Sequence, residues 1–180
     1  KGFQELRSVW SDLSTQFNLK AFLRSFFVYS MGVQTVMLMA VLFAKKEVEW
    51  GDQDDAGLIV SILIIQFVAI LGAYLFAQMS KRIGNIKVLA TALVIWVGVC
   101  FSAYFISTPV QFYLLAAVVG LVMGGIQALS RSTYSKLIPE TLDHASYFSF
   151  YDVVEKLGIV IGTLLFGLIE GATSSMRNSA

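Results

Sequence analysis

Three ionisable residues, Asp152, Glu155 and Lys156, fall within one helical turn of each other at the start of an apolar run. The run itself, residues 157–169, would be ~20 Å long as a helix, which is too short to cross a hydrocarbon core of ~30 Å. A membrane-crossing helix here must include the charges, which places Glu155 and Lys156 near mid-depth. Ionised residues at that depth face a bundle interior or a water-filled cavity, and they are typical of proton and ion pathways.

The spacing of these charges indicates how they could pair. Asp152 and Lys156 are four residues apart, so they can pair on one helix face. Glu155 points ~100° away from Lys156 and needs another partner or a proton. One hypothesis makes Glu155 a proton or cation carrier and Lys156 a substrate or counter-charge site. The alternatives are an ion pair that only fixes helix packing, and a helix that starts later and leaves the charges at the cytoplasmic interface.

Glutamines add a second set of candidate polar groups inside apolar stretches: Gln34, Gln66 and Gln127. An amide in hydrocarbon is costly unless it bridges helices or faces a polar cavity. We expect Gln34 to face such a cavity, with Tyr29 in its polar surroundings. For Gln66, an interhelical hydrogen bond is the favoured interpretation.

The elements that must position these residues are long apolar stretches. Hydrophobic residues make up 57% of the 180 residues and charged residues 14%, against ~25% charged in soluble domains. Helices of about 20 residues cross a bilayer. The sequence therefore predicts an all-α integral membrane protein with five transmembrane helices, over 21–44, 57–79, 86–106, 110–132 and 146–169.

Basic residues predict the orientation of these helices. If the five helices alternate, the side of the N-terminus carries Lys1, Arg7, Lys20, Arg24, Lys81, Arg82, Lys87, Arg131 and Lys136, and the other side carries only Lys45, Lys46 and Arg177. The positive-inside rule then places the N-terminus in the cytoplasm.

Residues 1–18 have a different pattern. Apolar residues recur every three or four positions, at Phe3, Leu6, Trp10, Leu13 and Phe17. This predicts an amphipathic helix along the cytoplasmic interface. A soluble linker helix that packs on another part of the protein is the alternative. The chain has no initiator Met, and residues 174–180 have the composition of a loop, so we expect a fragment of a longer chain.

Small residues recur every four positions in the fourth and fifth stretches: Ala116, Gly120 and Gly124 in one, Gly158 and Gly162 in the other, followed there by Gly167 and Gly171. Small residues let membrane helices approach closely. We expect helix packing, and a sliding contact in a moving bundle is the functional alternative.

Several function classes find no support. A net charge of +1 gives no reason to expect a nucleic-acid partner. The only histidine, His144, has no cysteine or second histidine at ligand spacing, so no metal and no cofactor are predicted. No hydrolase, Walker or dinucleotide motif is present, and we do not expect an enzyme.

Three segments resemble one family. They are residues 29–35 (YSMGVQT), 124–132 (GGIQALSRS) and 147–152 (YFSFYD). Together they resemble the vacuole-effluxer, or autophagy-related permease, family of the major facilitator superfamily, and bacterial members above all. The resemblance covers nearly the whole chain.

The resemblance implies the C-terminal half of a twelve-helix transporter. Residues 1–18 would be its central linker and 19–180 a half-domain holding helices seven to eleven. The implied partners are the lipid bilayer, an N-terminal six-helix half, a small polar solute and protons. The implied location is a bacterial inner membrane. Gln34, Gln66, Gln127 and Glu155 would line the cavity, and the implied activity is proton-coupled alternating access. Amino-acid efflux is suggested by yeast members. A membrane scaffold or sensor without transport is the main alternative.

A superfamily loop motif, Gly-x-x-x-Asp-Arg-x-Gly-Arg-Lys, has a partial counterpart after the second stretch. Arg82 and Gly84 fit, and Lys87 follows, whereas Ala77 and Lys81 replace the first glycine and the aspartate. The acidic residue that would clamp a neighbouring helix is therefore absent.

Overall fold

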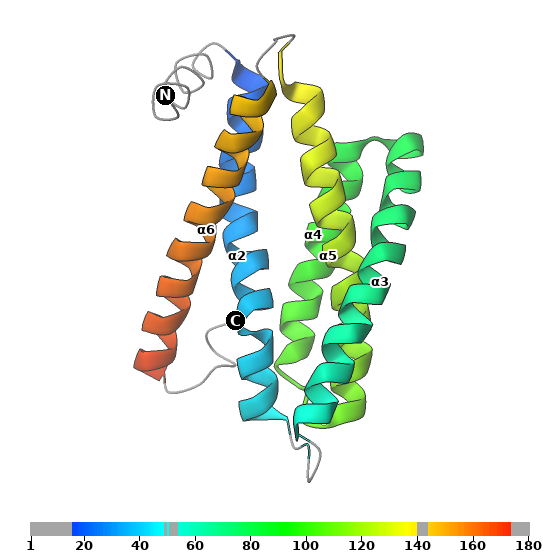
Figure 1. The fold of residues 1–180 in the computed structure, drawn as a ribbon, viewed down its shortest axis with the longest axis vertical. Coiled ribbons are helices and arrows are strands. Elements are labelled where there is room, and N and C mark those ends of the chain that lie inside the picture. The colour runs from blue at the N-terminus through cyan, green and yellow to red at the C-terminus, as the bar shows by residue number, and fades with distance from the viewer. Residues whose placement is uncertain (1–15, 49, 51–53, 140–143, 174–180) are drawn as a thin grey trace.

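The computed structural model describes residues 16–48, 50, 54–139 and 144–173, and within them all regular structure is α-helical (Figure 1). The helices, numbered as in Figure 1, are α2 (Phe17–Glu47), α3 (Asp54–Ile83), α4 (Asn85–Ala103), α5 (Pro109–Leu137) and α6 (His144–Thr173). The predicted all-α class is confirmed. The amphipathic helix predicted over 1–18 lies outside the described residues, apart from its last residues, where α2 begins.

The lengths of the helices suit a bilayer. Within the described residues, four helices are long and apolar enough to cross a membrane: Phe17–Lys45, Ala56–Ile83, Asn85–Ala103 and Pro109–Leu137. The fifth, α6, is 30 residues long but is not one of the four, because the charges at 152, 155 and 156 interrupt its apolar run. That α6 also crosses the bilayer stays a prediction.

The helices associate in two groups. The largest contact joins α3 to α5, with α4 packed on the same pair, and the second largest joins α2 to α6. In Figure 1, α2 and α6 lie side by side, and both run from the top of the view towards the bottom. The two groups touch each other through a smaller contact between α2 and both α5 and α3.

Glycines allow the α3–α5 backbones to approach closely. A Cβ added at Gly124 would overlap the carbonyl group of Ala69, and one at Gly120 would lie 2.5 Å from the carbonyl oxygen of Ile65. In the opposite direction, a Cβ at Gly72 would overlap the carbonyl of Leu121. Ala116, at the end of the same stripe, is 3% exposed. No larger side chain fits at these positions without moving a helix.

Glycines also allow α2 and α6 to approach closely, over a shorter length of helix. A Cβ at Gly158 would lie 3.2 Å from Ser30 Oγ, and one at Gly162 would overlap the Thr35 hydroxyl. In contrast, a Cβ added at Gly167 or at Gly171 would meet no other part of the described structure within 4 Å. The expectation that these two glycines also pack against a helix is not met by the described part of the chain.

The connections between helices are short. A single residue, Gly84, links α3 to α4 with φ of +91°, a backbone conformation that side chains disfavour. Thr108 caps α5: its hydroxyl accepts from Gln111 N, and the Gln111 side chain accepts in turn from Thr108 N. The helix α4 ends at Ala103, a few residues before the predicted 106.

An aromatic cluster fills the bundle at the end where α2 and α6 begin and α5 ends. Phe26 of α2 stacks on Tyr151 of α6 at 4.1 Å between ring centroids, and Tyr151 also contacts Tyr134 of α5. The Tyr134 hydroxyl donates to the carbonyl oxygen of Tyr147 at 2.7 Å. Three helices are therefore held together next to the charges of α6.

Candidate functional site

Glu155 contacts helix α2 through a glutamine. Gln34 Nε2 donates to Glu155 Oε1 at 2.7 Å, and the Glu155 side chain is 19% exposed. An ionised carboxylate only accepts hydrogen bonds, so the amide nitrogen is the group that must face it. The two residues are 121 positions apart, and the parallel course of α2 and α6 brings them together.

Arg131, from the last turns of α5, adds a positive charge to this pair. Its Nη2 lies 3.4 Å from Asp152 Oδ1 and 3.9 Å from Glu155 Oε2. The Arg131 and Asp152 side chains are 58% and 45% exposed, so this part of the site is open. We call Gln34, Arg131, Asp152 and Glu155 the carboxylate network. Three helices contribute to it, and one guanidinium serves two carboxylates.

The pairing of Asp152 with Lys156 that the spacing allows is not the one the structure shows. Asp152 pairs with Arg131 instead, because α5 brings a guanidinium to the same face of α6. Lys156 is exposed, and it makes no ion pair within the described residues.

The structure shows an interhelical hydrogen bond for one of the three glutamines. Gln34, expected to face a cavity, makes the interhelical hydrogen bond to Glu155. Gln66, expected to bond between helices, is exposed and has no hydrogen-bond partner in the described part of the chain. Gln127 of α5 is exposed as well. Counting residues along a helix cannot tell which side of it a neighbouring helix covers.

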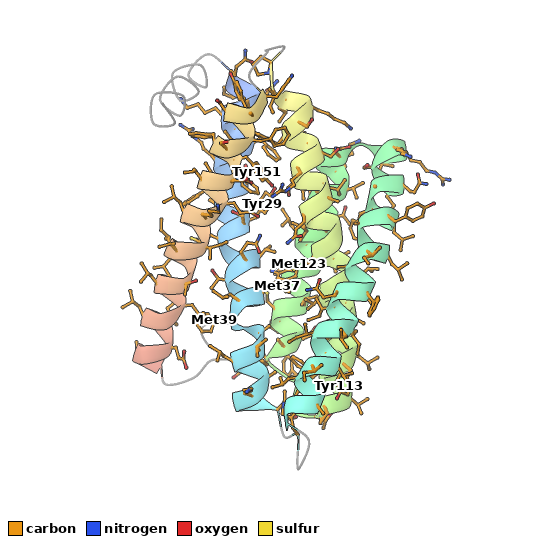
Figure 2. The ribbon with its side chains drawn as sticks, viewed as in Figure 1. Tyr29, Met37, Met39, Tyr113, Met123 and Tyr151 are labelled. Atoms are coloured by element: carbon orange, nitrogen blue, oxygen red, sulfur yellow. The ribbon has the colours of Figure 1, made fainter. Side chains whose placement is uncertain are left out.

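Tyr29 provides a second link between α2 and α5 beside the network. Its hydroxyl lies 2.7 Å from Ser130 Oγ. Ser130 uses its only proton on the carbonyl oxygen of Ile126 at 2.6 Å, so Tyr29 is the donor in this pair. The Arg131 guanidinium stands 5.7 Å from the centre of the Tyr151 ring. In Figure 2, Tyr29 and Tyr151 lie close together in the upper half of the bundle.

A small apolar cavity of about 60 Å³ lies farther along α2, between the two helix groups. Its lining includes Met37, Phe43, Cys100, Phe112 and Phe166. None of the carboxylate network lines it. The polar groups therefore gather on one side of the contact between the two groups, and apolar side chains surround the space on the other.

The residues of the loop motif lie at the α3–α4 turn. Arg82 and Lys87 are exposed on either side of Gly84. The residue that ties this turn to α5 is Asn85: its Nδ2 donates to Ser132 Oγ at 3.1 Å, and its Oδ1 accepts from Lys136 Nζ at 3.1 Å. The Asn85 amide thus links the α3–α4 turn to α5.

Sequence reasoning missed Arg131 and Asn85 as site residues. Arg131 was counted only as a loop charge that sets orientation. A usable signal was present, because it follows a long apolar span and lies within the 124–132 segment that carried the family resemblance. Among the described residues, no group of three His, Cys, Asp or Glu side chains is placed to hold a metal ion.

Comparison with known proteins identifies the family. The model of the family described as "Vacuole effluxer Atg22 like" matches residues 1–180. The chain is 32% identical over 153 residues to an uncharacterized MFS-type transporter, YxiO, of Bacillus subtilis, covering 84% of this chain and 34% of that protein. It is 31% identical over 169 residues to autophagy-related protein 22 of Eremothecium gossypii, covering 88% and 32%.

The chain thus spans about a third of the length of these relatives. No solved structure gave a significant match. The predicted resemblance is confirmed, and the apolar helices agree with a protein embedded in a membrane. The chain belongs to the vacuole effluxer family.

Proposed function

We propose that this chain is the C-terminal half of a secondary active transporter, which moves a small polar solute by proton-coupled alternating access between two six-helix halves. The observation that carries the proposal is the position of Glu155. Its carboxylate is held by Gln34 of α2 and approached by Arg131 of α5, so one titratable group of α6 contacts two other helices. Such groups inside membrane bundles are typical of proton relays.

Gln34 suits a partner that gains and loses a proton. When Glu155 is ionised, the amide N–H donates to it at 2.7 Å. When Glu155 is protonated, its O–H becomes a donor, and the amide can rotate so that its oxygen accepts. The contact between α2 and α6 is therefore kept in both states.

The interactions of Arg131, unlike those of Gln34, change when Glu155 is protonated. With both carboxylates ionised, the guanidinium is attracted by Asp152 at 3.4 Å and by Glu155 at 3.9 Å. A proton on Glu155 removes the second attraction and leaves Asp152 as the only charged partner. Protonation therefore weakens the hold of α5 on α6 while α2 stays bound, which is a way to couple a proton to relative helix movement.

The solute path is assigned to the faces that carry exposed polar residues. Gln66, Gln127 and Lys156 are exposed on α3, α5 and α6, and polar groups in apolar helices need polar surroundings. We place the N-terminal half of the transporter, and the solute between the halves, against these faces. Residues 1–18 are then the linker between the halves and 19–180 the C-terminal half-domain.

The solute class and the location are the finer part of the proposal. The family is described as vacuole effluxers, and one relative is named as a bacterial MFS-type transporter. We propose amino acids as the solute class and a bacterial inner membrane as the location. The basic residues of the α3–α4 turn and of α5 favour a cytoplasmic position for that end of the bundle.

Transport by the full-length protein in liposomes tests this proposal against a scaffold or sensor. Vesicles are loaded with a mixture of radiolabelled L-amino acids, and a pH gradient is imposed with and without a protonophore. A transporter produces a solute flux that the gradient drives and the protonophore abolishes. A folded, correctly inserted protein that gives no flux above empty vesicles, for amino acids or for other small polar solutes, would contradict the proposal.

A further inference from the structure

Four basic residues gather at the turn between α3 and α4. Lys81 and Arg82 are in the last turn of α3, and Lys87 is in the first turn of α4. Since Gly84 alone connects the two helices, these three residues belong to one tight turn. Lys136 of α5 joins them, because its Nζ donates to Asn85 Oδ1 at 3.1 Å. We call Lys81, Arg82, Lys87 and Lys136 the basic patch.

The basic patch has no acidic partner among the described residues. All four side chains are exposed, and none makes an ion pair within the described residues. Residues 81–87 contain no Asp or Glu. Arg131, close by on α5, differs, since it lies near Asp152 and Glu155. Among the described residues, the patch is therefore a positive surface without acidic partners at one end of the bundle.

Apolar side chains accompany the charges. Ile83 is 50% exposed and Ile86 is 66% exposed, one on each side of Gly84. A free anion such as phosphate would neutralise the charges but leave both isoleucines uncovered. An anionic phospholipid covers both, because its headgroup meets the cations while its acyl chains contact the apolar side chains.

We propose that the basic patch binds the headgroup of an anionic phospholipid of the surrounding membrane. The phosphate lies between the end of α3 and the start of α4, and the chains run along Ile83 and Ile86. Lys136 brings α5 into the same contact through Asn85, so the bound lipid stabilises the arrangement of the three helices at this end. This inference is independent of the transported solute and of Glu155.

Native mass spectrometry of the full-length protein tests the proposal. The protein in detergent is titrated with dioleoylphosphatidylglycerol, and dioleoylphosphatidylcholine serves as the neutral lipid with the same chains. We compare the wild type with Lys81→Gln/Arg82→Gln. The matched control is Lys20→Gln/Arg24→Gln, which removes one Lys and one Arg, both exposed, from the start of α2 at the same end of the bundle.

Each cation near a membrane surface contributes a factor on the order of five to the affinity for an anionic lipid. We expect Lys81→Gln/Arg82→Gln to weaken phosphatidylglycerol binding by more than tenfold and the control to change it by less than about threefold. Lys87→Gln alone, in a variant with unchanged thermal unfolding, should weaken it about fivefold.

Three results would overturn the proposal. One is equal binding of the two lipids by the wild type. Another is an equal loss of affinity in the patch variant and in its control, which indicates diffuse charge attraction. The third is displacement of the lipid by millimolar inorganic phosphate, which indicates an anion site where contacts with acyl chains do not contribute to binding.

Discussion

Glu155 has one neighbour on each of two other helices, and these neighbours differ in kind. Gln34 forms a short hydrogen bond of 2.7 Å, whereas Arg131 stands at 3.9 Å, beyond hydrogen-bond distance. The amide therefore sets the position of the carboxylate, and the guanidinium acts through charge. Because Arg131 is more than half exposed, water screens that attraction, and the hydrogen bond dominates the local energetics.

Replacing Gln34 tests how much the hydrogen bond between its amide and the Glu155 carboxylate stabilises the protein. In Gln34→Leu, a partly buried carboxylate oxygen loses its donor, and we expect a loss of ~1–3 kcal/mol in the free energy of unfolding. In the double variant Gln34→Leu/Glu155→Leu both polar groups are absent, so the loss should be smaller than in Gln34→Leu alone. Thermal unfolding of the full-length protein in detergent measures both. A double variant less stable than the single one would show that the two residues do not act as a pair.

Local spacing could predict the charges of the site but not their partners. The four-residue interval between Asp152 and Lys156 correctly places them on one helix face, yet Asp152 pairs with Arg131. Helical periodicity fixes which residues of one helix lie together, and it carries no information on what a second helix brings. Gln34, 121 positions away from Glu155, could not be assigned to it without the tertiary structure.

At the scale of the helices, hydropathy located each of the five described helices, and it placed their ends less accurately. Most predicted spans stop short of the helix termini, since α3 continues to Ile83 and α5 to Leu137 with polar residues that hydropathy excludes, whereas the span 86–106 runs past the end of α4 at Ala103. The recurrence of Gly120 and Gly124 indicated a packing face, and they do lie against α3. The same recurrence suggested packing at Gly167 and Gly171, but a Cβ added at either would meet no other part of the described structure within 4 Å.

Two glycine-to-alanine variants separate helix packing from helix propensity. In Gly124→Ala, the new Cβ overlaps the Ala69 carbonyl, so α3 and α5 must move apart, and we expect a net loss of ~1–3 kcal/mol. In Gly98→Ala, nothing lies within 4 Å of the new Cβ, and the higher helix propensity of alanine should leave stability unchanged or raise it by up to ~1 kcal/mol. Thermal unfolding in detergent compares them. Equal stability of the two variants would mean that α3 and α5 do not pack as described.

At the scale of the whole molecule, the bundle consists of α2 with α6 and of α3, α4 and α5, joined by polar links on one side. Tyr29 to Ser130 and Arg131 to the two carboxylates cross between the groups. Farther along α2, an apolar cavity of about 60 Å³ separates them. The contact between the groups is therefore smaller than the α3–α5 and α2–α6 contacts, and it combines these polar links with apolar packing of Phe26, Val33 and Phe43 of α2.

The central claim is that Glu155 carries the coupled proton, and Glu155→Gln tests it most directly. Glutamine keeps the shape and the contact to Gln34 but cannot be ionised. The full-length protein is reconstituted, and two rates are measured: exchange of labelled for unlabelled solute without a pH gradient, and accumulation driven by a gradient. Glu170→Gln, the same substitution elsewhere on α6, is the matched control.

We predict that Glu155→Gln retains exchange within about threefold of the wild type, because exchange needs no net proton movement. Accumulation driven by the gradient should fall to the level of empty vesicles, and Glu170→Gln should retain both rates. Accumulation by Glu155→Gln at the wild-type rate would contradict the account, since the proton would then move without this carboxylate.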